Sequence, residues 1–123
     1  MSRTTVVQCL GGKLKELPVS QVAYFEASDK LVDAHGIDGK VLVITDTIAC
    51  LEAEFADLFV RTHRSVLVAR RLLESVDYSA INSNGTVKLL GVDHPIKASR
   101  REVPKIRDIL KELWPDDDRT AFL

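Results

Sequence analysis

Positive charge is concentrated in two short stretches of this sequence, and the side chains that carry it are ones that bind anions. Residues 61–71 contain four arginines and no acidic residue, and residues 97–107 contain five basic residues against one acidic residue. The chain of 123 residues has a formal net charge of −1 as a whole. Two basic stretches within a nearly neutral chain predict a single surface that faces a polyanion.

Length and composition favour one soluble domain. Hydrophobic residues make up 46% of the chain and charged residues 28%, as in ordinary globular proteins. We expect a single domain over residues 1–114 and an acidic C-terminal tail over residues 115–123. The longest purely apolar runs, residues 41–44 and 66–69, are far shorter than the ~20 residues that span a bilayer. We therefore expect no membrane partner.

The amino end and the cysteines point to the cytoplasm. The first residues lack the apolar segment of a secretory signal, so we expect a cytoplasmic protein. Cys9 lies in an apolar, strand-like run and Cys50 in a helical pattern. Two cysteines without a CxxC spacing are expected to be reduced, buried thiols.

Hydrophobic patterning predicts a chain that is mainly β. Turns are expected at Gly11-Gly12, at Asp38-Gly39 and at Ser83-Asn84-Gly85, because glycine and asparagine tolerate the dihedrals of tight hairpins. We expect seven to eight short strands, drawn from residues 6–10, 13–17, 22–27, 31–34, 41–44, 72–78, 87–90 and 94–98.

Two helices are expected between and after these strands. Thr45 or Asp46 can cap the first helix, whose apolar face would carry Ile48, Leu51, Phe55 and Leu58. Its acidic residues, Glu52, Glu54 and Asp57, are expected to point away from any bound anion. The second helix is expected near residues 102–113, and Pro104 places its start close to Arg101, since proline is tolerated only in a first turn.

The order of these features resembles the LytTR DNA-binding domain of bacterial transcription regulators. The resemblance runs from residue 6 to residue 113 and rests on Tyr24-Phe25-Glu26-Ala27, on Phe59-Val60-Arg61-Thr62-His63-Arg64-Ser65-Val66-Leu67-Val68 and on Ala98-Ser99-Arg100-Arg101. It implies an elongated sandwich of antiparallel β-sheets with two short helices. It also implies that loops, and not a recognition helix, read the DNA.

By position, the resemblance assigns DNA contacts to Asp29 and Lys30, to Arg64 and to Arg101. Arginine suits this role because its fork of donors matches guanine O6 and N7, which contributes ~1–3 kcal/mol of discrimination. We expect Arg64 and Arg101 to contact bases. Phosphate contacts, which add affinity independent of sequence, are expected from Arg61, Arg70, Arg100 and Lys97, with hydroxyl contacts from Ser65 and Ser99.

Some of these residues have an equally simple structural interpretation. His63 is either a DNA contact or a structural histidine bonded to a neighbouring carbonyl. Arg61 either contacts a phosphate or pairs with Asp57 or another acid. Arg71 and Arg107 are expected to be ordinary surface residues.

The sequence offers no pattern typical of catalysis or of a cofactor. Ser65 and His63 are expected to point to opposite faces of an extended segment, which would exclude a nucleophile and base pair. His35, His63 and His94 lack the spacing of metal ligands, and Gly11-Gly12 precedes no phosphate-binding lysine. We expect no enzyme activity, no cofactor and no metal.

These expectations lead to one main hypothesis and two alternatives. The chain would bind double-stranded promoter DNA in a sequence-specific way and regulate transcription, with a second copy on an adjacent direct repeat. It would either act as a stand-alone form or be controlled by a receiver domain on a separate chain. One alternative is a stand-alone interaction protein that binds and inhibits a larger LytTR-type regulator. A weaker alternative is a module that binds RNA or polyphosphate.

Overall fold

A computed structural model describes residues 3–10, 13–81 and 84–115 of the chain. Within these ranges there are three short 3₁₀ turns, Val19–Gln21, Arg70–Leu72 and Arg100–Glu102, and two α-helices, α1 (Ile48–Glu54) and α2 (Val103–Leu113). The same ranges contain ten strands: β1 (Thr5–Leu10), β2 (Lys13–Pro18), β3 (Val22–Ser28), β4 (Leu31–Gly36), β5 (Val41–Ile44), β6 (Phe59–His63), β7 (Val66–Ala69), β8 (Leu73–Ser79), β9 (Asn84–Leu89) and β10 (Ile96–Ala98).

The predicted mainly β fold with two helices is confirmed, but seven to eight strands was too low a number. The basic segment forms a hairpin of two strands, β6 and β7, whose turn is Arg64-Ser65. That turn contains no glycine, asparagine or proline, so its hairpin could not be predicted from turn residues. The predicted turn residues Gly11-Gly12 and Ser83 lie outside the described residues, as do residues 116–123 of the predicted acidic tail.

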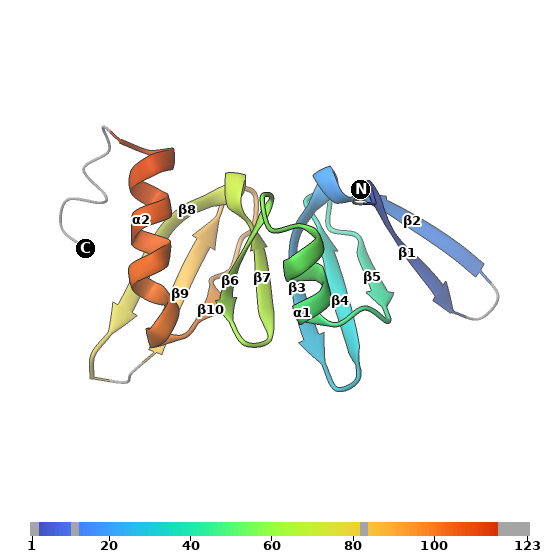
Figure 1. The fold of residues 1–123 in the computed structure, drawn as a ribbon, viewed down its shortest axis with the longest axis horizontal. Coiled ribbons are helices and arrows are strands. Elements are labelled where there is room, and N and C mark those ends of the chain that lie inside the picture. Colours follow the sequence, from blue (N-terminus) through green and yellow to red (C-terminus); the bar gives the residue numbers. More distant parts are fainter. Residues whose placement is uncertain (1–2, 11–12, 82–83, 116–123) are drawn as a thin grey trace.

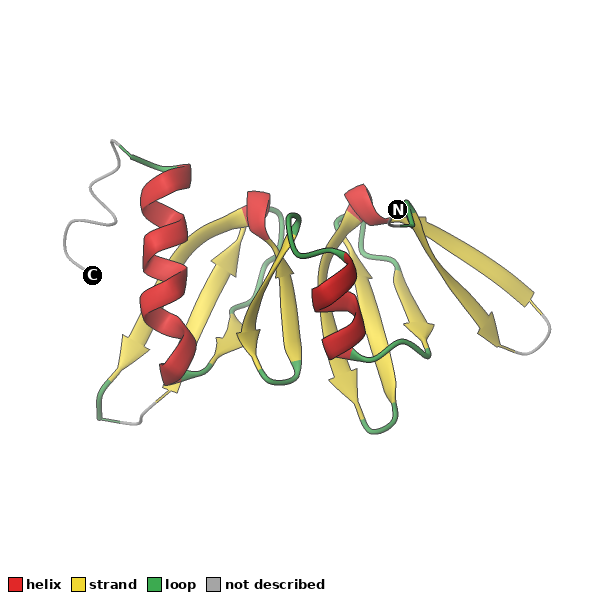
Figure 2. Ribbon diagram, viewed as in Figure 1, coloured by secondary structure: helices red, strands yellow, loops and turns green. Residues whose placement is uncertain are grey.

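Three antiparallel sheets follow one another along the long axis of the molecule (Figures 1 and 2). The first is the β1-β2 hairpin, the second has the order β5-β4-β3-β7-β6, and the third has the order β10-β9-β8. Helix α2 lies beside the third sheet, and α1 packs against β3, β6 and β7 of the second. The predicted sandwich is therefore built of three sheets, with the five-stranded one in the middle.

Strands β3 and β7 form the centre of the fold because both of their faces are covered. Tyr24 pairs with Val68, and Phe25 pairs with Leu67. Phe25 and Leu67 belong to the core shared with β1, β2 and α1, whereas Tyr24 and Val68 belong to the core shared with the third sheet and α2. Strands buried on both faces have uninterrupted apolar sequences, which explains why these two do not alternate.

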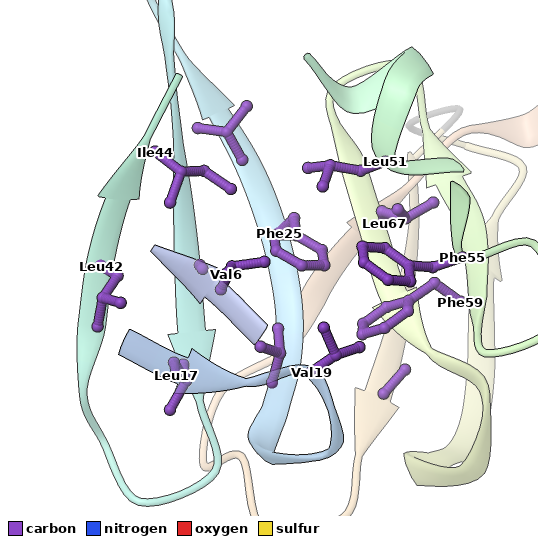
Figure 3. Close-up of a cluster of buried hydrophobic side chains, with 14 of the residues drawn as sticks. Val6, Leu17, Val19, Phe25, Leu42, Ile44, Leu51, Phe55, Phe59 and Leu67 are labelled. Atoms are coloured by element: carbon purple, nitrogen blue, oxygen red, sulfur yellow. The ribbon is translucent and has the colours of Figure 1, made fainter. Parts of the chain in front are cut away.

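Aromatic rings fill the first core (Figure 3). The Phe59 ring lies 5.1 Å from that of Phe25 and 6.2 Å from that of Phe55, measured between ring centroids, and all three side chains are buried. Leu51 of α1 packs in the same cluster. This core joins α1 to the middle sheet, so the helix has a fixed position relative to β6 and β7.

The second core holds α2 against the third sheet. Val103, Ile106 and Leu110 of α2 are buried there together with side chains of β8, β9 and β10. At the far end of the helix, the Trp114 indole Nε1 donates a hydrogen bond of 3.0 Å to the carbonyl of Leu73. Neither helix in the described part of the chain has the length and apolar character needed to cross a membrane.

Helix α1 differs from the prediction in three respects. Thr47, and not Thr45 or Asp46, caps it, since the Thr47 hydroxyl accepts from the amide of Cys50 at 3.1 Å. The helix ends at Glu54, so Leu58 falls beyond the apolar face and is 54% exposed. Cys50 is free, as expected, but it is exposed and not buried. The side chain of Cys9 lies outside the described residues.

Helix α2 begins as Pro104 predicts. The proline lies in the first turn of the helix, where its missing amide removes no helical hydrogen bond. A 3₁₀ turn over Arg100–Glu102 precedes the helix, so both arginines stand outside the regular α-helical part. The predicted hairpin at Asp38-Gly39 is also confirmed, with Gly39 at a φ of 90° between β4 and β5.

Thr62 connects the middle sheet to the third sheet. The β6-β7 register shifts between Arg61 and His63, which leaves Thr62 in a bulge. Its carbonyl accepts from the amide of Ser99 at 2.7 Å, and its hydroxyl donates to the carbonyl of Lys97 at 3.0 Å. Thr62 is the buried polar residue of the described chain, with an exposed fraction of 0%. The bulge thus joins β6 to the end of β10.

We expect Thr62→Val to lower the free energy of unfolding by ~1 kcal/mol, because valine keeps the shape of the buried side chain and removes the hydrogen bond to the Lys97 carbonyl. Urea denaturation measures this loss. The matched control is Thr45→Val, at an exposed threonine, which should unfold like the wild type. Equal stability of the two variants would show that the Thr62 hydroxyl contributes nothing to the junction.

His35 makes the fold sensitive to acid. Its ring stacks on Tyr24 with centroids 4.2 Å apart and planes 7° apart, and its Nε2 is buried with no hydrogen-bond partner among the described residues. Burial lowers the pKa of His35, opposed by the nearby Asp33 and Glu26 carboxylates and reinforced by His94. The folded protein therefore favours the neutral ring.

A lowered pKa makes the folded state bind fewer protons than the unfolded chain, so stability is complete above the unfolded value of about 6.5 and is lost as the pH falls below it. We expect the urea midpoint to decrease between pH 7.5 and pH 5, and His35→Phe to reduce that decrease while preserving the stack on Tyr24. If the urea midpoint falls by the same amount with pH in the wild type and in His35→Phe, His35 is not the residue responsible.

Candidate nucleic-acid interface

Three turns that are distant in the sequence lie along one edge of the molecule. They are the β3-β4 turn at Asp29 and Lys30, the β6-β7 turn at Arg64 and Ser65, and the 3₁₀ turn Arg100–Glu102 that leads into α2. Figure 1 shows all three at the same end of their strands. The fold therefore brings Arg64 of the first basic stretch and Arg100 and Arg101 of the second to one edge.

Two neighbouring hollows make this edge continuous. The first, which we name the Arg64 hollow, is lined by Glu52, Arg61, His63, Arg64, Ser99, Arg100, Arg101, Glu102 and Lys105. The second, the Lys30 hollow, has Asp29 and Lys30 on one side and Arg61, Arg64 and Ser65 on the other. Arg61 and Arg64 belong to both hollows, so cationic side chains follow one another from Lys30 to Arg101.

Three arginines at this edge keep their guanidinium groups available. Arg64, Arg100 and Arg101 are exposed, and within the described ranges none of their guanidinium groups has a hydrogen bond or an ion pair. Unpaired arginines that face a shared hollow are ready to bind an anion or the edge of a base. We name the residues Lys30, Arg64, Arg100, Arg101 and Lys105 the basic edge.

The turn that carries Arg64 is held by neighbouring polar groups. Arg61 donates to the carbonyls of His63 and Arg64, at 3.3 Å and 2.6 Å. The carbonyl of Ser65 accepts from the amide of Ala27 at 2.8 Å, which joins the turn to β3. The backbone of the turn is therefore fixed on both sides, while the Arg64 side chain projects from it.

His63 and Ser65 are hydrogen-bonded to each other. The prediction that they point to opposite faces is therefore wrong. The Ser65 amide donates to His63 Nδ1 at 3.2 Å, and the Ser65 hydroxyl lies 2.9 Å from the same nitrogen. The expectation was wrong because residues two positions apart share a face even in an extended strand, and because this segment is a tight turn. Burial lowers the pKa of His63, as do Lys97 and Arg64, which favours a neutral ring that accepts at Nδ1.

The acidic side chains of α1 do not all point away from the basic edge. Glu52 lies in the Arg64 hollow, where its carboxylate accepts from Arg61 at 2.8 Å. The acid that pairs with Arg61 is thus Glu52 and not Asp57. Glu54 pairs with Arg3, whose guanidinium lowers the pKa of that carboxyl.

The position of Arg100 and Arg101 follows from the junction at Thr62. Because the Ser99 amide donates to the Thr62 carbonyl, the chain leaves β10 next to the end of β6. The 3₁₀ turn then places both arginines between that junction and α2. Lys105 in the first turns of α2 pairs with Glu102 at 2.6 Å, which keeps this lysine at the rim of the Arg64 hollow.

Two predicted contact residues have other surroundings. Arg70 lies at the opposite end of β7, where it forms an ion pair with Glu112 and lines a separate hollow with Arg71. Arg71, expected to be a plain surface residue, donates to the carbonyl of Ser20 in that region. Lys97 is near the basic edge, with its ammonium 3.7 Å from the carboxylate of Glu26.

Two residues that shape the site, Glu52 and Lys105, were not predicted from the sequence. Glu52 was assigned to the wrong face of α1, and Lys105 was counted in the basic stretch without a role. Asp29 has a φ of 56°, the left-handed region, which a two-residue hairpin turn between paired residues Ser28 and Leu31 explains.

Comparisons with known proteins agree with this architecture. Residues 12–111 match the family model described as the LytTr DNA-binding domain. Over 98 residues the chain is 33% identical to the positive alginate biosynthesis regulatory protein of Pseudomonas aeruginosa, covering 79% of this chain and 39% of that protein. The chain therefore spans about two fifths of the length of that relative.

A solved structure has the same fold. The LytTr DNA-binding domain of a methyl-accepting/DNA response regulator from Bacillus cereus superposes with a TM-score of 0.72 at 20% sequence identity, covering 89% of this chain and 98% of that one. At this level of identity the match shows the arrangement of strands and helices. Together with the family model, which covers most of the sequence, it leads to one conclusion: the chain belongs to the LytTr DNA-binding domain family.

Proposed function

We propose that this chain binds double-stranded DNA in a sequence-specific way, through the turns of the basic edge, and that it serves transcription regulation. One observation carries the proposal. Arg64 and Arg101 are 37 positions apart in the sequence, yet they line one hollow, and within the described ranges neither guanidinium is paired with an acid. A sandwich fold has no need of unpaired cations at this place, whereas a DNA-binding surface does.

Arg64 and Arg101 are our candidates for base contacts. Both are exposed on turns that project beyond the strand ends, and such turns can enter a groove that a flat sheet face cannot. A guanidinium group that donates two parallel hydrogen bonds to guanine discriminates by ~1–3 kcal/mol against another base. The fixed backbone around Arg64 reduces the entropy that is lost when it binds.

The other cations of the edge are candidates for phosphate contacts. Lys30 lies beyond Arg64 in the Lys30 hollow, and Arg100 and Lys105 flank Arg101 in the Arg64 hollow. Lys97 stands near His63, and Ser65 and Ser99 are close enough to the arginines to donate to the same DNA backbone. These contacts would set the position of the duplex and give binding its salt dependence.

The binding partners expected from the family resemblance remain part of the proposal. A second copy of the chain would occupy an adjacent direct repeat, and a receiver domain is a further candidate partner. The alternative function, inhibition of a larger LytTR-type regulator through protein contacts, requires no free arginines at the edge. The unpaired state of Arg64 and Arg101 therefore favours DNA.

We expect Arg64→Ala and Arg101→Ala each to reduce the preference for a cognate over a scrambled duplex by about 5- to 150-fold, the equivalent of ~1–3 kcal/mol. Fluorescence anisotropy with both duplexes measures the preference. Arg70→Ala is the matched control, because Arg70 is paired with Glu112 on another part of the surface, and it should bind like the wild type. Undiminished preference in both edge variants would favour the inhibitor alternative.

Lys30→Ala and Arg100→Ala should weaken binding to both duplexes alike and reduce the slope of log affinity against log salt by about one each, since each removes one phosphate contact. Lys40→Ala, at an exposed lysine of the β4-β5 turn, is the control of equal charge. A salt series of binding isotherms gives the slopes. If Lys40→Ala lowers the slope as much as Lys30→Ala does, the attraction is a property of net charge and not of this edge.

A further inference from the structure

We propose that Arg61 is a positioning residue, which together with Glu52 fixes the β6-β7 turn that presents Arg64 and makes no contact with DNA itself. This inference rests on the proposed function and departs from the phosphate contact that the sequence suggested for Arg61. The Arg61 side chain lines both hollows together with the other cations, but its guanidinium group is bonded to Glu52 and to the turn itself.

All three guanidinium nitrogens of Arg61 are engaged within the protein. Nη1 donates to Glu52 Oε1 at 2.8 Å, Nη2 donates to the Arg64 carbonyl at 2.6 Å, and Nε donates to the His63 carbonyl at 3.3 Å. The side chain is 24% exposed, although neighbouring Arg64 is freely accessible. These bonds use three of the five N–H donors of the guanidinium group, so a phosphate could reach only the two that remain without displacing a hydrogen bond.

The contacts of Arg61 complete the bonding of the turn. Ser65 is held at its amide by His63 and at its carbonyl by Ala27, and Arg61 adds the carbonyls of His63 and Arg64. Because the adjacent carbonyls of His63 and Arg64 both accept from the same guanidinium group, the backbone between them has little freedom to rotate. The exit direction of the Arg64 side chain is therefore fixed before any DNA arrives.

Glu52 connects this turn to the first core. Its helix is anchored there by Ile48 and Leu51, which are buried next to Phe25. The ion pair between Glu52 and Arg61 thus holds the turn that carries Arg64 in a fixed position relative to the first core. Lysine cannot replace Arg61 in this role, since one ammonium group lacks the planar fork that reaches a carboxylate and two carbonyls together.

The pair also removes a charge conflict at the basic edge. A carboxylate in the Arg64 hollow would repel phosphate, and Arg61 neutralises it from within the protein. Because Arg61 neutralises Glu52 and no DNA phosphate, it releases no counterion from the DNA when the duplex binds. Its removal should therefore change the preference for sequence and leave the salt slope unaltered, which is the opposite of a phosphate contact.

The test compares Arg61→Lys, Arg61→Ala and Glu52→Ala on cognate and scrambled duplexes over a salt series. We expect all three to reduce the preference for the cognate duplex by about tenfold, a change of ~1.4 kcal/mol, with salt slopes equal to that of the wild type for the two Arg61 variants. If Arg61→Lys binds like the wild type and Arg61→Ala lowers the slope by about one, Arg61 is a phosphate contact and the inference is overturned.

A measurement on the free protein separates this inference from the proposed function. Amide hydrogen exchange at Ser65 and Ala27 should be about tenfold faster in Arg61→Lys, the effect of losing ~1.4 kcal/mol of local stability, while Phe25 and Leu67 keep their protection. Unchanged exchange at Ser65 would refute the positioning role even if DNA binds. Absence of any duplex preference in the wild type would refute the proposed function, whatever the exchange rates show.

Discussion

The arrangement of the site depends on the hydrogen bonds that Thr62 makes across the boundary between two sheets. A bulge in β6 frees the Thr62 carbonyl from the ladder with β7, and the carbonyl then pairs with Ser99 while the hydroxyl pairs with Lys97. These bonds bring the end of β10 to the end of β6. Without this junction, the turn with Arg64 and the turn with Arg101 would belong to separate sheets that are related only through the packing of the second core.

A second constraint is the distribution of acidic partners. Arg3, Arg61 and Arg70 each have a carboxylate, from Glu54, Glu52 and Glu112, and each serves the fold where it stands. Among the residues that the structure describes, no carboxylate pairs with a cation of the basic edge except Glu102, which pairs with Lys105. The other cations of the edge are therefore available to bind an anion. Net charge therefore says little about this chain, because the proposed function depends on which arginines remain unpaired.

Much of this architecture could be predicted from the sequence, and the failures have physical causes. Apolar runs and glycine turns located most strands, and Pro104 located the start of α2. The β6-β7 turn was missed because Arg64 and Ser65 are not turn residues, and their conformation is imposed by contacts from Arg61, His63 and Ala27. The partner of Arg61 and the separation of Arg70 from the edge depend on long-range packing, which local patterns do not encode.

The central claim is that DNA approaches one edge formed by three distant turns. An NMR titration of the isotope-labelled chain with a cognate duplex tests it most directly. The account predicts that amide shifts change at Lys30, at Arg64 and Ser65, and at Arg100 and Arg101, with little change around Arg70 and Arg71. Shifts that concentrate at Arg70 and Arg71, with the three turns unaffected, would contradict it.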